Sequence, residues 1–124
     1  MNIVDSSAWL EYFANSKNAK NFIKPIENTK RLIVPTIIIY EIFKKILHEK
    51  DEHIALQIIA HLKQGKVVDL SLELSISAGK LSYEHKIPMA DAIILATANK
   101  YNAKIWTQDA DFKGLKNVMY FKKN

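Results

Sequence analysis

Four acidic residues stand at positions where a carboxylate needs a specific reason to be. Asp5 closes a β-prone run at the start of the chain, and Asp109 follows another β-prone run near its end. Glu41 and Asp91 each stand inside a stretch that is otherwise almost entirely apolar. Carboxylates are rarely buried unless something compensates their charge. A hard divalent cation such as Mg²⁺ would compensate all four together, because it takes carboxylate and water oxygens as ligands.

A cluster of this kind could hydrolyse phosphodiester bonds. Two like charges about 5 Å apart repel by roughly 3 kcal/mol at an effective dielectric constant of about 20. The acids can therefore converge only around a cation, with some of them protonated, or with a basic side chain inserted. A cation held there could position a water molecule, lower the pKa of that water and stabilise charge on a phosphoryl oxygen.

Each of these acids also has an ordinary structural explanation. Asp5 could cap the helix that follows it, and Glu41 could face solvent and pair with lysines one turn later. Asp91 falls in the first turn of an expected helix, where the helix dipole favours a carboxylate. Asp109 and Asp111 could be turn residues. One shared cation would explain the positions of all four acids, whereas the separate explanations require four unrelated causes.

The elements that must position these residues alternate between strands and helices. The expected strands are the β-prone runs at residues 2–5, 32–34, 67–70, 104–107 and 118–121. Apolar spacing predicts helices around residues 6–13, 19–26, 36–49, 54–62, 71–83 and 88–101. This alternation predicts an α/β fold with a parallel sheet covered on both faces. Ligands of such a sheet bind beyond the carboxyl ends of its strands, which is where Asp5, Thr107 and Asp109 are expected.

The sequence also predicts the capping residues of two helices and the apolar face of one of them. Thr36 and Ser71 are expected to cap the helices that follow them, because their hydroxyls can accept a free backbone N–H group. In the helix after Ser71, the large apolar residues Leu72, Ile76 and Tyr83 line up on one face.

Length and composition restrict the class of protein. The chain has 124 residues, 48% of them hydrophobic and 25% charged, which suits one globular domain with its own core. It contains no cysteine, which excludes disulfide scaffolds, zinc knuckles and thiol catalysis. No apolar run approaches the roughly 18 residues that span a bilayer, and the first residues do not resemble a signal peptide. We therefore expect a cytoplasmic protein without membrane association.

The charge balance favours a polyanionic partner. Lysine and arginine number 18 against 13 acids, a net charge of +5, and removing the four negative charges of the candidate cluster leaves +9 elsewhere. A basic surface around an acidic, cation-holding site suits cleavage of a nucleic acid, because the surface attracts the backbone. Arg31 is the only arginine, and lysine reads bases poorly. Binding is therefore expected to be electrostatic rather than base-specific.

Four segments resemble the motifs of the PIN-domain ribonucleases, and more narrowly of the VapC-type toxins of toxin–antitoxin modules. They are residues 3–10, with the first acid and its hydroxyl neighbours, 35–42, 89–98 and 107–112. Their order and spacing cover nearly the whole chain. The resemblance implies a three-layer α/β/α sandwich on a parallel sheet of about five strands, with residues 1–124 forming a single nuclease domain.

The resemblance also implies an activity and a set of site residues. The activity would be cleavage of RNA that depends on Mg²⁺ or Mn²⁺, and the partners would be a small cognate antitoxin that covers the site and a second copy of the chain. Asp5, Glu41, Asp91 and Asp109 would form an acidic tetrad in which Asp5, Asp91 and Asp109 contact the metal. Glu41 would help to hold the metal or its water, and Thr107 would orient the site by hydrogen bonding. Asp111 could share the role of Asp109.

Three other functions remain open at this point. A phosphoacceptor receiver domain is also an α/β chain of this size that binds Mg²⁺; Asp69 would be its acceptor and Thr107 its switch hydroxyl. A nuclease of the same fold could process RNA without being a toxin. A degenerate relative could bind RNA or a partner without cutting, although all four acids are present.

Overall fold

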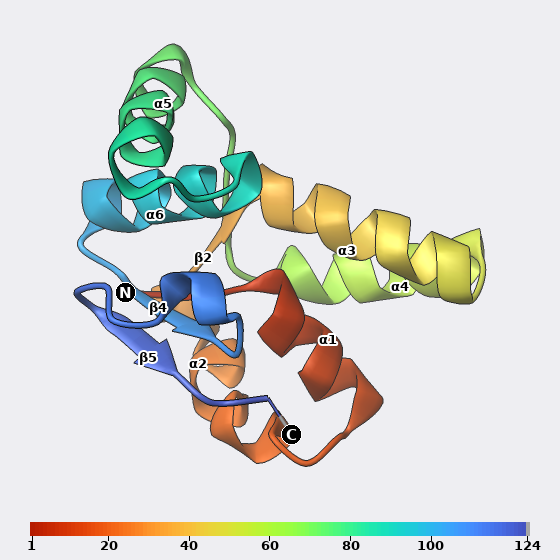
Figure 1. The fold of residues 1–124 in the computed structure, drawn as a ribbon. Coiled ribbons are helices and arrows are strands. Elements are labelled where there is room, and N and C mark those ends of the chain that lie inside the picture. The colour runs from red at the N-terminus through yellow and green to blue at the C-terminus, as the bar shows by residue number, and fades with distance from the viewer. Residues whose placement is uncertain (124) are drawn as a thin grey trace.

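A single sheet of five strands runs through the computed structural model, which describes residues 1–123. The strands are β1 (Asn2–Val4), β2 (Leu32–Pro35), β3 (Lys66–Val68), β4 (Lys104–Thr107) and β5 (Val118–Tyr120). They are all parallel and follow the order β3-β2-β1-β4-β5 (Figure 1). The prediction of a parallel sheet of about five strands is confirmed.

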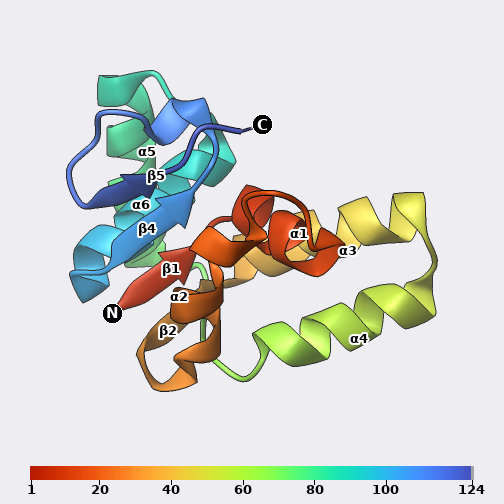
Figure 2. The same ribbon diagram turned by 90° about the horizontal axis from the view of Figure 1, so that it is seen from below.

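Helices cover both faces of this sheet. The α-helices are α1 (Ser6–Ala14), α2 (Ile23–Glu27), α3 (Thr36–Glu49), α4 (Glu52–Leu62), α5 (Leu72–His85) and α6 (Met89–Tyr101). Helix α6, with α5 stacked on it, covers one face, and α1 and α2 lie on the other, as Figures 1 and 2 show. Helices α3 and α4 pack against each other as a hairpin that projects from this body. The fold is the predicted three-layer α/β/α sandwich.

The core explains why these short strands form. Ile3 and Val4 of β1 and Ile33 and Val34 of β2 are all fully buried. Such continuous apolar runs are typical of parallel strands that helices cover on both sides. Trp9 of α1 is also fully buried and belongs to the same apolar core. Within residues 1–123, no helix is both long enough and apolar enough to cross a membrane.

Three local predictions are corrected by the structure. Thr36 is the first residue of α3 rather than its cap; Pro35 precedes the helix and offers no side-chain bond, so the hydroxyl of Thr36 caps nothing. The expected helix at 19–26 is divided, because a 3₁₀ turn at Ala19–Asn21 ends before α2 begins. Strand β3 ends at Val68, two residues earlier than predicted. Ser71 does cap α5, by accepting the backbone N–H of Leu74.

The predicted apolar face of α5 exists but faces solvent. Leu72 is 80% exposed, Ile76 67% and Tyr83 86%. Helix α5 packs on α6 through Leu74 and Ala78, which lie on its opposite side. The periodicity indicates a helix correctly, but α5 has two apolar faces, and α6 buries only one of them.

The strand order excludes the receiver alternative. In flavodoxin-like folds such as receivers, the third strand lies beside the first in the middle of the sheet. Here β3 lies at an edge, and β1 lies between β2 and β4. Asp69 is exposed and follows this edge strand, so it does not share the end of β1 with the other acids.

Candidate active site

Asp5 follows β1 directly, and three donors hold its side chain. Its Oδ1 accepts the backbone N–H of Ser6 at 2.8 Å, and its Oδ2 accepts the hydroxyls of Ser7 at 3.0 Å and Thr107 at 2.8 Å. The residue is 2% exposed. Burial raises the pKa of Asp5, and these hydrogen bonds oppose the shift. Asp5 caps α1, and its charge also acts on Glu41 and Asp91, so its roles as a helix cap and as a neighbour of the other acids are compatible.

Thr107 connects the carboxyl ends of β1 and β4. It is fully buried, donates its hydroxyl to Asp5 and accepts the backbone N–H of Asp109 at 2.9 Å. Asp109 in turn accepts the backbone N–H of Asp111 at 2.9 Å, at the start of the 3₁₀ turn Ala110–Phe112. One hydroxyl thus sets the position of Asp5 relative to the loop that carries two further acids.

Replacing Thr107 with valine is expected to lower the free energy of unfolding by about 1–3 kcal/mol, because a buried carboxylate loses a donor and a backbone N–H loses its acceptor. Urea denaturation monitored by circular dichroism measures this loss. Thr107→Ser keeps the hydroxyl and should retain most of the stability. A Thr107→Val variant as stable as the wild type would show that the hydroxyl does not contribute, and a loss in Thr107→Ser as large as that in Thr107→Val would show that the methyl group contributes as much.

Asp91 and the loop after β4 form a compact acidic group. Asp91 lies in the first turn of α6 and is 7% exposed. Carboxylate oxygens of Asp91, Asp109 and Asp111 all lie within 4.8 Å of one another. Burial, followed by the charges of Asp109, Asp5 and Asp111, raises the pKa of Asp91 to about 8. This group includes two of the three predicted metal contacts and Asp111, while Asp5 lies outside it.

Glu41 points one unsatisfied oxygen into the protein. Its Oε1 is buried and has no hydrogen-bond partner among residues 1–123. Burial raises the pKa of Glu41, the charges of Asp5 and Asp109 add to the shift, and hydrogen bonding from the Ser6 side chain opposes it. Pairing with a lysine of its own helix does not account for Glu41, because among residues 1–123 Lys45 pairs with Glu49 at 3.1 Å and Lys44 lies over the ring of Tyr40. Glu41 therefore belongs to the same electrostatic group as the acids after β1 and β4.

The acids fit a hard divalent cation. They offer several carboxylate oxygens close together, the ligand type that Mg²⁺ and Mn²⁺ prefer. In the described part of the chain, no lysine, arginine or histidine forms an ion pair with any of these five acids. Their mutual repulsion, together with the orphaned Oε1 of Glu41, is what a bound cation and its water ligands would relieve.

Sequence reasoning missed a polar network that fixes the loop between β4 and the acids. The side-chain amide N–H of Gln108 donates to Glu11 Oε1 at 3.1 Å. The side-chain amide N–H of Asn18 donates to Gln108 Oε1 and to the carbonyl of Lys122, both at 2.9 Å. Gln108 is buried although it is polar. In the sequence, only its position between Thr107 and Asp109 could have drawn attention to Gln108. Its partners Glu11 and Asn18 are distant in sequence, and the tertiary fold brings them to it.

Comparison with known proteins identifies the fold family. A family model described as PIN domain matches residues 3–118. The chain belongs to the PIN domain family. The resemblance drawn from the four motifs is therefore confirmed, and the matched range includes every acid of the cluster. No curated protein matches the sequence of this PIN domain.

Solved structures share the fold at low sequence identity. A toxin–antitoxin complex from Klebsiella pneumoniae aligns with a TM-score of 0.84 and 20% identity, covering 99% of this PIN domain and 100% of that chain. VapC20 from Mycobacterium tuberculosis, described as a sarcin–ricin loop cleaving toxin, aligns at 0.79 and 16%, covering 95% and 97%. VapBC2 from Rickettsia felis, bound to a DNA fragment from its promoter, aligns at 0.74 and 16%, covering 98% and 97%.

Proposed function

We propose that this PIN domain is an endoribonuclease that depends on a divalent cation, Mg²⁺ or Mn²⁺, and that acts in the cytoplasm as the toxin of a VapBC-type pair. The observation that carries the proposal is the group of Asp91, Asp109 and Asp111, whose oxygens converge with no basic ion-pair partner among residues 1–123. The fold shared with VapC20, a toxin described as cleaving the sarcin–ricin loop, supports RNA as the substrate class.

Each acid has a distinct part in this proposal. Asp5, Asp91 and Asp109 would hold the cation, and the convergence of Asp111 on Asp91 and Asp109 supports its sharing the role. When bound, the cation would neutralise charge on the phosphoryl oxygen and lower the pKa of water. The unsatisfied Oε1 of Glu41 would accept a hydrogen bond from that water, and the raised pKa of this carboxylate makes it a stronger proton acceptor than an exposed glutamate.

A groove beside the acids supports an antitoxin partner. A cavity of about 680 Å³ lies between α1 and the α3–α4 hairpin. Leu10 and Phe13 of α1 and Ile46, Ile54 and Ile58 of the hairpin supply its apolar wall. At one end it reaches Ser6 and Ser7, the donors to Asp5. A partner segment with apolar side chains followed by a basic one would fill the groove and neutralise the acids, a feature that an RNA-processing nuclease does not need.

The exposed face of α5 supports a homodimer. We call Leu72, Ile76, Gly79 and Tyr83 the α5 stripe. A Cβ at Gly79 would meet nothing within 4 Å, so packing within the chain does not require this glycine, although glycine costs about 1 kcal/mol in a helix. A glycine there lets another backbone approach closely.

A second copy of the chain is the occupant that the shape of the stripe favours, because two such stripes packed together would bury each other's apolar side chains. Charge does not direct this pairing, because Glu73 pairs with Lys100 of α6 at 3.8 Å and Glu84 lies beside His85 and Lys86 at the C-terminal end of α5. Exposed apolar patches larger than a few hundred Å² are uncommon on monomers. The stripe is therefore proposed as the dimer interface.

Replacing Ile76 with glutamate is expected to convert the dimer to a monomer, because it places two charges in an apolar contact. Size-exclusion chromatography with light scattering measures the change in mass. Leu56→Glu introduces the same charge at an exposed position of α4 and should leave the mass unaltered. A wild-type protein that is monomeric at tens of micromolar concentration would rule out this interface.

Cleavage of a mixed RNA pool by the purified chain tests the nuclease proposal. We expect cutting with Mg²⁺ or Mn²⁺, none with EDTA, and recovery when the metal is restored. Mass spectrometry of the sample establishes that no bound antitoxin masks the activity. Cutting that is equally fast in EDTA would contradict a reaction that depends on the acidic cluster.

A further inference from the structure

A second cavity lies at the opposite end of the sheet from the acids. It has a volume of about 490 Å³ and is bordered by Asn2 and Lys104, which begin β1 and β4. Thr107, at the far end of β4, is three residues from Lys104, a rise of about 10 Å along the strand. The cavity is therefore separate from the candidate active site, and neither the proposed antitoxin groove nor the α5 stripe includes it.

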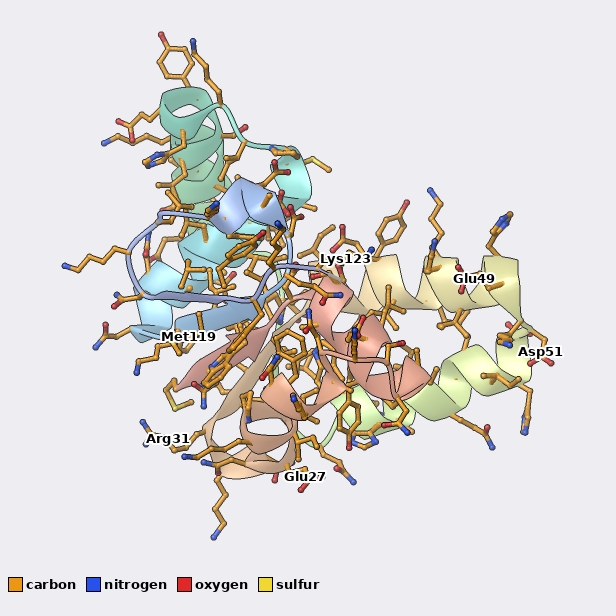
Figure 3. The ribbon with its side chains drawn as sticks, turned by 60° about the horizontal axis from the view of Figure 1, so that its bottom comes forward. Glu27, Arg31, Glu49, Asp51, Met119 and Lys123 are labelled. Carbon is orange, nitrogen blue, oxygen red and sulfur yellow. The ribbon has the colours of Figure 1, made fainter. Side chains whose placement is uncertain are left out.

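Cations line this cavity without any acid. Lys24, Arg31 and Lys104 all border it, and no aspartate or glutamate is among its described lining residues. None of these three cations forms an ion pair within residues 1–123. Figure 3 shows Arg31 and Met119 on one side of the molecule, away from Asp51 at the tip of the α3–α4 hairpin. Three unpaired cations around one cavity favour an anionic occupant.

Arg31 gives this charge a specific geometry. It is the only arginine of the chain, whereas the basic surface elsewhere consists of lysines. The planar guanidinium presents paired N–H donors that match two oxygens of one phosphate group, which an ammonium group cannot do. The side chain has no ion-pair partner in the described structure to hold these donors.

Side-chain amides supply further donors. The indole N–H of Trp106, which can only donate, bonds to Asn2 Oδ1 at 2.9 Å. This bond fixes the orientation of the Asn2 amide and leaves its two N–H groups for another acceptor. Asn28 and Asn102 also border the cavity. A lining that offers cations and amide donors suits a ligand with several acceptor oxygens, such as a phosphate.

An apolar wall lies beside these donors. It consists of Pro25, Trp106 and Met119. The indole of Trp106 stacks on the ring of Phe121, with 6.2 Å between centroids and 15° between planes, which holds it in place. Bases stack well on fixed aromatic side chains. The lining therefore matches a phosphate that carries a base better than it matches an inorganic anion.

We propose that this cavity binds a nucleotide, with its phosphate on Arg31, Lys24 and Lys104 and its base against Trp106. The nucleotide can be a free molecule or one residue of a nucleic-acid strand, since both present the same groups. The site requires neither the divalent cation nor the nuclease activity proposed above.

Tryptophan fluorescence reports on this site directly. The chain has two tryptophans; Trp9 is fully buried, whereas Trp106 is only partly buried and borders the cavity. Titrations in EDTA with inorganic phosphate, 5′-AMP and a ten-residue oligouridylate would exclude binding through a metal. We expect 5′-AMP to change the emission at lower concentration than phosphate does. If the oligouridylate binds at least tenfold more tightly than 5′-AMP, the natural ligand is a nucleic-acid strand. If the difference is smaller, the natural ligand is a free nucleotide.

Charge-matched variants separate the site from general surface attraction. Arg31→Gln should weaken binding of 5′-AMP about tenfold or more, because a charge-assisted bidentate contact is lost. Lys63→Gln removes the same charge at an exposed position after α4 and should have less than a twofold effect. Asp91→Asn should bind as the wild type does, even if nuclease activity is absent. Equal weakening by Arg31→Gln and Lys63→Gln would overturn the proposal, as would an emission change with polyglutamate but not with 5′-AMP or the oligonucleotide.

Discussion

Replacing Asp91 with asparagine is expected to lower the rate of RNA cleavage about 10³-fold while the fold remains intact. Asp91 lies within the acidic group at the start of α6, and its carboxylate is proposed to contact the cation. A loss of that size corresponds to about 4 kcal/mol of transition-state stabilisation, within the range that one bound cation supplies. Cleavage of a fluorescent RNA at saturating Mg²⁺ measures the rate.

Asp69→Asn is the matched control for this variant. It makes the same change at an exposed residue after β3, so its cleavage rate should equal that of the wild type. Circular dichroism and thermal melts of both variants establish that they are folded. Full activity in Asp91→Asn would show that this residue does not belong to the active site. A loss of activity in both variants would indicate a defect in the protein samples rather than an effect of Asp91.

Without divalent cations, the protein is expected to become less stable as the pH rises from about 5 to about 8. The pKa of Asp91 is raised to about 8 in the folded chain. Between the ordinary pKa of aspartate and this value, the folded state holds a proton that the unfolded state has released. The free energy of unfolding therefore falls with pH. The loss is on the order of a few kcal/mol, or on the order of 10 °C in the melting temperature.

Mg²⁺ should reverse this trend, because it binds the ionised acids of the folded chain only. Melting temperatures measured at pH 5, 6.5 and 8, with EDTA and with Mg²⁺, test both statements. Asp91→Asn should show a flatter pH dependence in EDTA and a smaller stabilisation by Mg²⁺. Stability that increases from pH 5 to pH 8 in EDTA would contradict the raised pKa.

The sequence was sufficient to predict the alternation of strands and helices and the place of the main acids. Asp5 and Thr107 could be placed because each comes at the carboxyl end of an apolar run, and ends of parallel strands share one edge. Asp91 stood out because it is a charge inside an apolar helix. Each of these predictions depends only on the position of a residue within its own strand or helix, and that position does not change when the segments assemble into the sheet.

Other features depended on contacts between distant segments. The sequence names Asp111 only as a second acid that could share the role of Asp109, and its position beside Asp91 follows from the 3₁₀ turn after Asp109. The bond between Asn18 and Gln108 spans 90 residues and has no local signal. The exposure of Tyr83 could not be read from spacing either, because periodicity identifies a helix face without saying whether another layer covers it.

The bond between Thr107 and Asp5 joins residues 102 positions apart, and this separation determines when the acidic group can assemble during synthesis of the chain. Chains emerge from the ribosome beginning at the N-terminus, and contacts between distant residues form late in folding. A ribosome-bound chain can therefore present Asp5 and Glu41 long before β4 inserts beside β1 and supplies Asp109. Until then the acidic group is incomplete. If the chain cleaves RNA as proposed, it would be inactive toward nearby RNA for most of its translation, and a partner that binds the finished chain would still act in time.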